Sequence, residues 1–139
     1  MDVGIGGGRF VSERPLTWGF DVNPAAVAWL KGRDLFHDPY EHLVDAVTFW
    51  DSLEHIHDPR PLLANVRKFV FVSLPIFEDV AHVLRSKHFK KEEHCWYFSA
   101  RGFESFMLSL GFQMVERNTM EQSCREDISS YVFRRVRQA

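Results

Sequence analysis

The sequence predicts an α/β domain whose sheet is mostly parallel, with one antiparallel strand at its C-terminal edge. Glycines stand at alternate positions near the start of the chain, between two acids that each belong to a short apolar stretch. Two further apolar runs, at 45–50 and 68–75, have the composition of strands that are buried on both faces. Helix-forming segments separate these strands, which is the arrangement that builds a parallel sheet.

The elements before the second acid are expected to be short. The first strand covers 2–5 at most, and the helix after the glycines should end early because Pro15 cannot continue it. Residues 16–20 then form the second strand.

The next segment carries clear helix signals. Asn23 is a suitable N-cap, Pro24 suits the first turn, and Gly32 is a plausible C-terminal stop. Residues 33–43 should hold a very short third strand and a loop, and 45–50 is the fourth strand.

The second half of the chain continues the alternation. A helix over about 58–66 precedes the fifth strand at 68–75. Residues 77–98 are the least regular part, and we expect either a solvated connector or a flap over a substrate pocket. Apolar residues at helical spacing then predict a helix over 103–110, and 112–117 and 129–137 read as a closing antiparallel pair.

Length and composition indicate a single domain over residues 1–139. A net charge of −2 does not favour nucleic acid or an acidic membrane surface as a partner. No apolar run reaches the roughly 18 residues that span a bilayer, and no secretory signal opens the sequence. Cys95 and Cys124 lack metal-type spacing, so free thiols in the cytoplasm are the expected state.

The spacing of the glycines distinguishes between cofactors. Asp2, Gly4, Gly6 and Gly8 follow an acid-x-Gly-x-Gly-x-Gly pattern. A dinucleotide fingerprint would need a glycine at the sixth position counted from Gly4, where this chain has Arg9. A dinucleotide-binding protein is therefore a secondary alternative.

Four later segments follow a recognisable order: 18–30 (WGFDVNPAAVAWL), 45–63 (DAVTFWDSLEHIHDPRPLL), 69–75 (FVFVSLP) and 92–116 (EEHCWYFSARGFESFMLSLGFQMVE). Together with the glycine loop they resemble class I S-adenosylmethionine-dependent methyltransferases of the small-molecule type, similar to the ubiquinone-biosynthesis-like subfamily. Relative to that family, the chain looks shortened at its N-terminus. The resemblance implies a Rossmann-like fold.

The resemblance also implies an activity. We expect an enzyme that transfers a methyl group from S-adenosylmethionine to a small-molecule acceptor, most often a hydroxyl oxygen, and releases S-adenosylhomocysteine. A degenerate relative that binds weakly or does not catalyse is the main alternative. A homodimer is plausible, because the first strand is short for a central strand.

The resemblance assigns roles to the residues at the ends of the strands. The loop glycines should line the methionine end of the cofactor, Asp21 should bind the ribose hydroxyls, and Asp38, with Asp34 as the alternative, should contact the adenine. The tetrapeptide after the fourth strand should lie beside the sulfonium or the adenine. The expected cofactor-binding residues are Asp2, Gly4, Gly6, Gly8, Asp21, Asp38, Trp50, Asp51 and Ser52.

A hydroxyl acceptor needs a base, and histidine is the natural candidate near neutral pH. His55 and His94 both fall where the resemblance puts the rim of the pocket, so each is a candidate catalytic residue. His55 and His57 are two residues apart, which on a helix points them away from each other. We therefore expect no metal ion.

Overall fold

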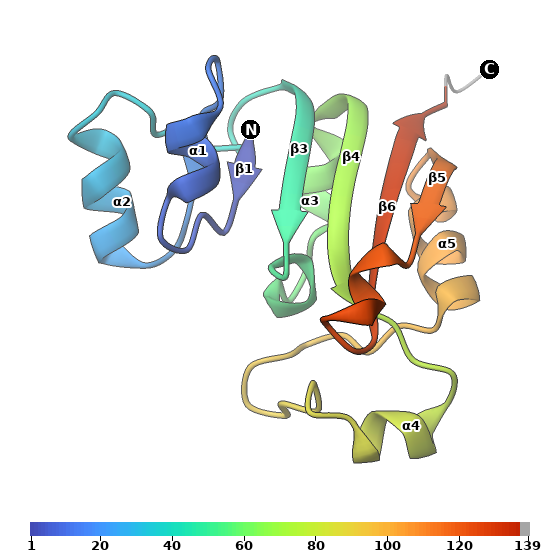
Figure 1. Cartoon of the computed structure of the whole chain (residues 1–139). Coiled ribbons are helices and arrows are strands. Elements are labelled where there is room, and N and C mark those ends of the chain that lie inside the picture. Colours follow the sequence, from blue (N-terminus) through green and yellow to red (C-terminus); the bar gives the residue numbers. More distant parts are fainter. Residues whose placement is uncertain (137–139) are drawn as a thin grey trace.

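A six-stranded sheet in the order β2-β1-β3-β4-β6-β5 forms the centre of the computed structural model, which describes residues 1–136 (Figure 1). The strands are β1 (Asp2–Val3), β2 (Gly19–Phe20), β3 (Val44–Trp50), β4 (Val66–Pro75), β5 (Phe112–Asn118) and β6 (Ile128–Arg135). The pairs β1–β2, β1–β3 and β3–β4 are parallel. The strand β6 runs antiparallel to both β4 and β5.

The predicted fold class, a mostly parallel sheet with an antiparallel C-terminal strand, is confirmed. The structure adds one detail. The antiparallel strand β6 lies between β4 and β5, so the edge position belongs to β5. Residue 137, the expected end of the last strand, lies outside the described residues.

Helices lie on both faces of the sheet (Figure 1). On one face, α1 and α2 contribute Val11 and Leu30 to a small buried cluster with Ile5. On the other face, α3 and α5 cover the larger core. The helices are α1 (Arg9–Glu13), α2 (Pro24–Lys31), α3 (Arg60–Ala64), α4 (Val80–Arg85), α5 (Ala100–Ser109), and the 3-10 turns η1 (Leu53–His55) and η2 (Met120–Ser123).

The ends of α2 are capped as predicted. The Asn23 side chain accepts a hydrogen bond from the Ala25 N–H, Pro24 opens the first turn, and Gly32 is the C-cap. An N-cap of this kind satisfies one of the amide groups that a helix leaves without an internal partner. The local sequence therefore determines where this helix begins and ends.

The expected second strand is too long by three residues. Leu16 has φ of 60° and is fully exposed, so it belongs to a turn, and β2 begins only at Gly19. The first strand likewise covers only Asp2–Val3. The very short third strand is reduced to a single parallel bridge between Gly19 and Phe36.

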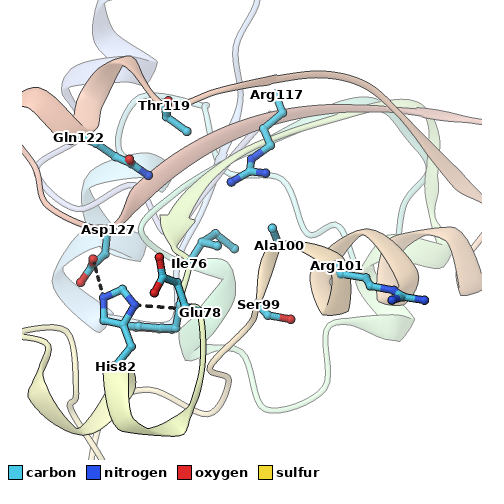
Figure 2. A pocket seen from close by; sticks show the side chains of 11 residues that line it. Ile76, Glu78, His82, Ser99, Ala100, Arg101, Arg117, Thr119, Gln122 and Asp127 are labelled. Atoms are coloured by element: carbon cyan, nitrogen blue, oxygen red, sulfur yellow. Dashed lines mark hydrogen bonds and ion pairs between the residues drawn. The ribbon is translucent and has the colours of Figure 1, made fainter.

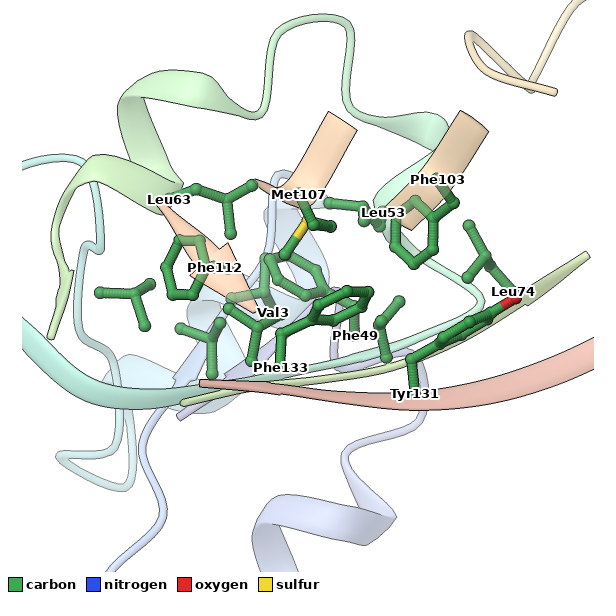
Figure 3. Close-up of a cluster of buried hydrophobic side chains, with 14 of the residues drawn as sticks. Val3, Phe49, Leu53, Leu63, Leu74, Phe103, Met107, Phe112, Tyr131 and Phe133 are labelled. Atoms are coloured by element: carbon green, nitrogen blue, oxygen red, sulfur yellow. The ribbon is translucent and has the colours of Figure 1, made fainter. Parts of the chain in front are cut away.

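The main core is aromatic and lies between the sheet and α5 (Figure 3). Phe103 of α5 contacts Tyr131 and Phe133 of β6 edge to face, at ring-centroid distances of 5.2 Å and 5.4 Å. Such edge-to-face pairs are favourable beyond the apolar area that they bury. This packing holds β6 against α5, and β6 in turn pairs with the middle of β4 through Tyr131 and Phe133.

On the opposite face of β3, β4 and β6, described helices lie over the carboxyl ends of β3 and β4, where Glu121 of η2 bonds to Ser73 and Ser130 and Phe10 of α1 packs on Trp50. Strand register places Thr48, Phe71 and Val132 side by side on this face. All three are only partly buried. Among the described residues, no helix is both long and apolar enough to cross a membrane.

Candidate functional site

A cavity of about 490 Å³ opens at the carboxyl ends of β1, β2 and β3. Ligands in open α/β sheets bind at this edge, and the volume is within the range of small-molecule sites, about 300–1,000 Å³. Its walls are formed by Val3, Gly4, Gly6, Phe20, Asp21, Val22, Tyr40, Asp51, Ser52, His55, Ile56 and His57. Six of the predicted site residues are therefore brought together: Gly4, Gly6, Asp21, Asp51, Ser52 and His55.

The glycine loop turns sharply out of β1. Gly4 has φ of 77° and Gly6 has φ of 52°, a region that glycine enters without steric penalty. A Cβ on Gly4 would lie 2.6 Å from the Cβ of Ser52, whereas a Cβ on Gly6 would meet nothing within 4 Å. Gly4 is thus needed for close packing, and Gly6 leaves the backbone open towards the cavity.

Asp21 follows β2 directly and lines the cavity. Its Oδ1 accepts a hydrogen bond from the Asn23 N–H at 2.8 Å. This local bond fixes the side chain while Oδ2 has no hydrogen-bond partner among the described residues. The carboxylate therefore has acceptor capacity left for a ligand.

The segment after β3 is tied to the glycine loop and to the C-terminal part of the chain. Ser52 Oγ donates to the Val3 carbonyl at 2.6 Å, and the Asp51 N–H donates to the Ser73 carbonyl at 2.9 Å. Asp51 has φ of 52° and its carboxylate pairs with Arg125 from the loop before β6. The wall of the cavity is therefore held in place from two sides.

Two predicted residues lie behind the loop and do not line the cavity. Asp2 is buried, and its carboxylate accepts a 2.6 Å hydrogen bond from Thr48 Oγ1. Burial raises the pKa of Asp2, and the Thr48 hydrogen bond opposes this shift. Gly8 precedes α1 at φ of 74°, where a Cβ would lie 3.0 Å from the Trp29 ring. Both residues shape the loop without facing the cavity.

Asp38 and Trp50 are also absent from the cavity wall. The Asp38 carboxylate accepts from the Tyr40 N–H at 2.8 Å, which turns the chain so that the Tyr40 side chain lines the cavity. Trp50 is 38% exposed and packs edge to face on Phe10 of α1. The cofactor contacts predicted for these two residues have no support from the cavity geometry.

Sequence reasoning missed several apolar and aromatic wall residues, namely Val3, Phe20, Val22, Tyr40 and Ile56, and also His57. The positions of Phe20 and Val22, on either side of Asp21, could have indicated that they line the cavity. No sequence pattern indicated this for Tyr40, because its position depends on the loop that replaces the third strand.

Glu54, His55 and His94 come together at the η1 end of the cavity. One ligand atom from each side chain lies within 4.8 Å of the other two. The rings of His55 and His94 meet edge to face at 4.6 Å, although 39 positions separate them in the sequence. The two predicted catalytic histidines are thus neighbours, with His55 on the cavity wall and His94 behind it.

The loop that carries His94 is docked onto η1 by backbone contacts. The Cys95 N–H donates to the Glu54 carbonyl at 2.7 Å, and Trp96 Nε1 donates to the Ile56 carbonyl at 2.9 Å. His55 Nδ1 lies 2.9 Å from the Glu93 carbonyl. Residues 93–96 therefore act as a strap over η1.

Burial dominates the electrostatics of this cluster. Glu54 is 2% exposed, and burial raises the pKa of its carboxyl group to about 7. Burial also lowers the pKa of His94, with a further contribution from the charge of His55. Glu54 Oε2 and His94 Nδ1 are buried without a hydrogen-bond partner among the described residues. Both shifts favour the neutral forms of these groups.

A second cavity, of about 600 Å³, lies between α4, the start of α5 and the loop before β6 (Figure 2). His82 bridges two segments there, since its Nε2 lies 2.9 Å from Asp127 Oδ1 and its Nδ1 accepts from the Glu78 N–H. Arg101 and Arg117 also line this cavity. It shares no wall residue with the glycine-loop cavity, which remains the candidate active site.

A family model described as a methyltransferase domain matches residues 1–117. No curated protein matches the sequence. Among solved structures, a chain from the Haloferax volcanii complex of the Trm112 methyltransferase activator with a methyltransferase has a TM-score of 0.71 at 13% identity, over 99% of this chain and 82% of that chain.

Two further structures are similar. A Thermotoga maritima S-adenosylmethionine-dependent methyltransferase has a TM-score of 0.68 at 14% identity, over 97% of this chain and 81% of its own. The Synechocystis magnesium protoporphyrin IX methyltransferase, solved with bound S-adenosylhomocysteine, has a TM-score of 0.67 at 15% identity, over 97% and 72%. At these identities the structures establish a shared fold.

Proposed function

The chain belongs to the class I S-adenosylmethionine-dependent methyltransferases, and we propose that it transfers the methyl group to a hydroxyl oxygen of a small-molecule acceptor. One observation supports the proposal most. A single cavity is lined by the glycine loop after β1, the acid after β2 and the segment after β3. These three segments are the ones whose residues predicted the cofactor site.

The cavity geometry supports distinct cofactor contacts. Gly6 leaves room for a ligand to approach the loop backbone, and the N–H groups of Gly6 and Gly7 have no partner among the described residues. These donors suit the carboxylate of the methionine moiety. Asp21 suits the two ribose hydroxyls, and the apolar walls at Tyr40 and Ile56 suit the adenine ring.

The acceptor is proposed to enter at the η1 end of the cavity. Methyl transfer from a sulfonium is an in-line displacement, to which a protein mainly contributes positioning. A hydroxyl acceptor must also lose its proton. The cluster of Glu54, His55 and His94 is the titratable group beside this end of the cavity, and we assign removal of the proton to it.

Ligand selectivity distinguishes this function from its two rivals. S-adenosylhomocysteine should raise the melting temperature, because a ligand that binds only the folded state stabilises it by mass action. Nicotinamide adenine dinucleotide should have no effect. Stabilisation by the dinucleotide alone would support a dinucleotide-binding protein, and stabilisation by neither ligand would support a degenerate relative.

Acceptor chemistry needs a separate assay. The protein is incubated with S-adenosylmethionine carrying a labelled methyl group and with matched phenol, amine and carboxylate acceptors. The proposal expects label in the phenol or alcohol products together with released S-adenosylhomocysteine. Transfer to amines or carboxylates only would leave the methyltransferase assignment intact and overturn the choice of oxygen in a hydroxyl.

Two further expectations remain proposals. Assembly into a homodimer is supported by the partly exposed, partly apolar face of β3, β4 and β6 around Phe71. A cytoplasmic location is supported by the exposed and unpaired cysteines, Cys95 and Cys124.

A further inference from the structure

Beyond the proposed function, we propose that Glu54, His55 and His94 bind one divalent transition-metal ion, with zinc preferred. The three side chains come from two segments of the chain and present one carboxylate oxygen and two imidazole nitrogens within 4.8 Å of one another. The inference runs against the expectation from the sequence, because the partner of His55 is His94 rather than His57. The two imidazoles meet only in the folded chain.

The first argument is the isolated position of Glu54. Its side chain is 2% exposed, and Oε2 has no hydrogen-bond partner among the described residues. A buried carboxylate without a partner is strongly unfavourable, and buried charges in proteins are paired or coordinate metals. A cation between Glu54 and the imidazoles would provide the missing partner.

The second argument is the orientation of His55. Its Nδ1 faces the Glu93 carbonyl at 2.9 Å, and a carbonyl can only accept a hydrogen bond. The proton of the neutral ring must therefore be on Nδ1, which leaves the lone pair on Nε2. A backbone carbonyl that fixes the tautomer in this way is typical of the surroundings of metal-binding histidines.

The third argument concerns His94. Its Nδ1 is buried and has no partner among the described residues, although buried ring nitrogens are normally hydrogen bonded. The strap that carries it is tied to η1 through the Cys95 and Trp96 hydrogen bonds. A ligand shared between η1 and the strap would satisfy this atom and join the same two segments.

The donor set selects the class of ion. Two histidines and one carboxylate, with a fourth position open, form a known catalytic zinc set. Magnesium and calcium prefer oxygen ligands and would be bound poorly by two imidazoles. Zinc–ligand bonds of about 2.0–2.2 Å hold the ligand atoms roughly 3.4 Å apart, so the three atoms must move closer together. His55 is exposed and can make such a movement.

The position of the ion would also link it to the reaction. His55 lies on the wall of the cofactor cavity, so the open coordination position would face the acceptor end. A zinc ion lowers the pKa of a bound hydroxyl group. Removal of the acceptor proton would then still take place at this cluster, with the ion in place of a free imidazole.

Metal content tests the inference directly. The purified chain is stripped with a chelator, dialysed against zinc or magnesium, and analysed for bound metal and for affinity by calorimetry. We expect one zinc per chain and no magnesium. Glu54→Gln and His94→Asn should each weaken zinc binding at least tenfold, while the control His42→Asn, an exposed histidine outside the cluster and the cavity wall, should bind zinc as the parent does.

Several outcomes would overturn the inference: no zinc bound by the parent, magnesium bound in preference to zinc, or equal zinc affinity in Glu54→Gln. If Glu54→Gln does not fold, as judged by circular dichroism, the surface variant His55→Asn replaces it. S-adenosylhomocysteine binding is measured on the same samples. Loss of that binding with zinc retained would count against the proposed function and leave the ion site in place.

Discussion

Gly4 shows how one residue sets the shape of the cofactor loop. Two constraints act on it, because its φ of 77° disfavours any side chain and the Ser52 Cβ would be only 2.6 Å from an added methyl group. Gly7, three residues along, has an ordinary φ, and a Cβ there would meet nothing within 4 Å. Substitution of Gly4 therefore tests the loop geometry, and the same substitution at Gly7 serves as its control.

We expect Gly4→Ala to lower the free energy of unfolding and Gly7→Ala to leave it nearly unchanged. A left-handed conformation costs an alanine about 1–2 kcal/mol, and relief of the Ser52 contact adds to this. Gly7→Ala should fall within about 0.5 kcal/mol of the parent. Urea denaturation measures both, and equal stability of the two variants would contradict the loop geometry.

Asp21 is the residue on which the cofactor assignment can be tested most directly. Hydrogen bonds from the ribose to a charged acceptor are worth about 1.5–3 kcal/mol. Asp21→Ala should therefore weaken S-adenosylhomocysteine binding about tenfold or more, with the fold of the free protein intact. Calorimetry compares it with Glu104→Ala, a carboxylate on the exposed side of α5. Parent-like affinity in Asp21→Ala would remove this residue from the site.

Glu54 should make the stability of the metal-free protein depend on pH. Its pKa is raised from 4.5 to about 7, so between these values the folded state binds more protons than the unfolded chain. The stabilisation is complete below about pH 4.5 and is lost as the pH rises through about 7. A shift of this size corresponds to about 3 kcal/mol.

The measurement is urea unfolding of the parent and of Glu54→Gln at pH 5 and pH 8, with a chelator present. Glutamine stays neutral at both values. The free energy of unfolding of the variant should therefore rise relative to that of the parent between pH 5 and pH 8. Taking the difference between the two proteins removes the opposite contribution of His94, whose pKa burial lowers. A difference that does not change with pH would show that Glu54 ionises normally.

At the scale of the element, α5 has the clearest structural task. It begins at the Ser99 cap, whose Oγ accepts from the Gly102 N–H, and it buries Phe103 and Met107 against the sheet. Its other face is solvated, and Leu108 there is 58% exposed. The helix thus holds β6 in place through a narrow apolar stripe.

Phe103→Ala, at the centre of that stripe, should lower the free energy of unfolding far more than Leu108→Ala on the surface. Phe103 is fully buried and meets Phe98, Tyr131 and Phe133. Truncation of a buried phenylalanine to alanine costs about 3–5 kcal/mol, whereas Leu108→Ala should change stability by about 0.5 kcal/mol or less. Chemical denaturation of the two variants checks this, and similar losses would mean that α5 is not seated on this core.

At the scale of the whole molecule, the partly exposed face of β3, β4 and β6 around Phe71 is the feature that we expect to control assembly. Arg134 stands at one end of this face beside Phe69, and Glu121 bonds to Ser73 and Ser130 at the other. A second copy turned by a two-fold axis would place the Arg134 end of one face beside the Glu121 end of the other. Isologous contacts of this kind are the commonest in soluble oligomers.

We expect the chain to sediment as a dimer at high concentration and Phe71→Glu to sediment as a monomer, because a charge at the centre of the face would be buried without a partner. Leu108→Glu, on the opposite face of the molecule, should still form the dimer. Analytical ultracentrifugation with a concentration series measures this. A parent that stays monomeric throughout, or a Phe71→Glu variant that still dimerises, would show that a second copy does not cover this face.

The sequence by itself predicted the family, the alternation of most strands and helices along the chain, and the cap of α2. Asn23 caps α2, and alternate glycines allow the loop after β1, because both properties depend on a few neighbouring residues and on backbone sterics. The apolar runs of β3 and β4 are visible because burial on both faces leaves little choice of side chain.

Only the tertiary structure decided which side chains meet. The Asp38 carboxylate accepts a hydrogen bond from the Tyr40 N–H, and Tyr40 rather than Asp38 lines the cavity, because a loop replaces the third strand. His94 reaches His55 and Glu54 because the Cys95 N–H bonds to the Glu54 carbonyl and the Glu93 carbonyl bonds to the His55 side chain. Contacts between segments this far apart depend on how the whole chain packs, so a local sequence pattern does not predict them.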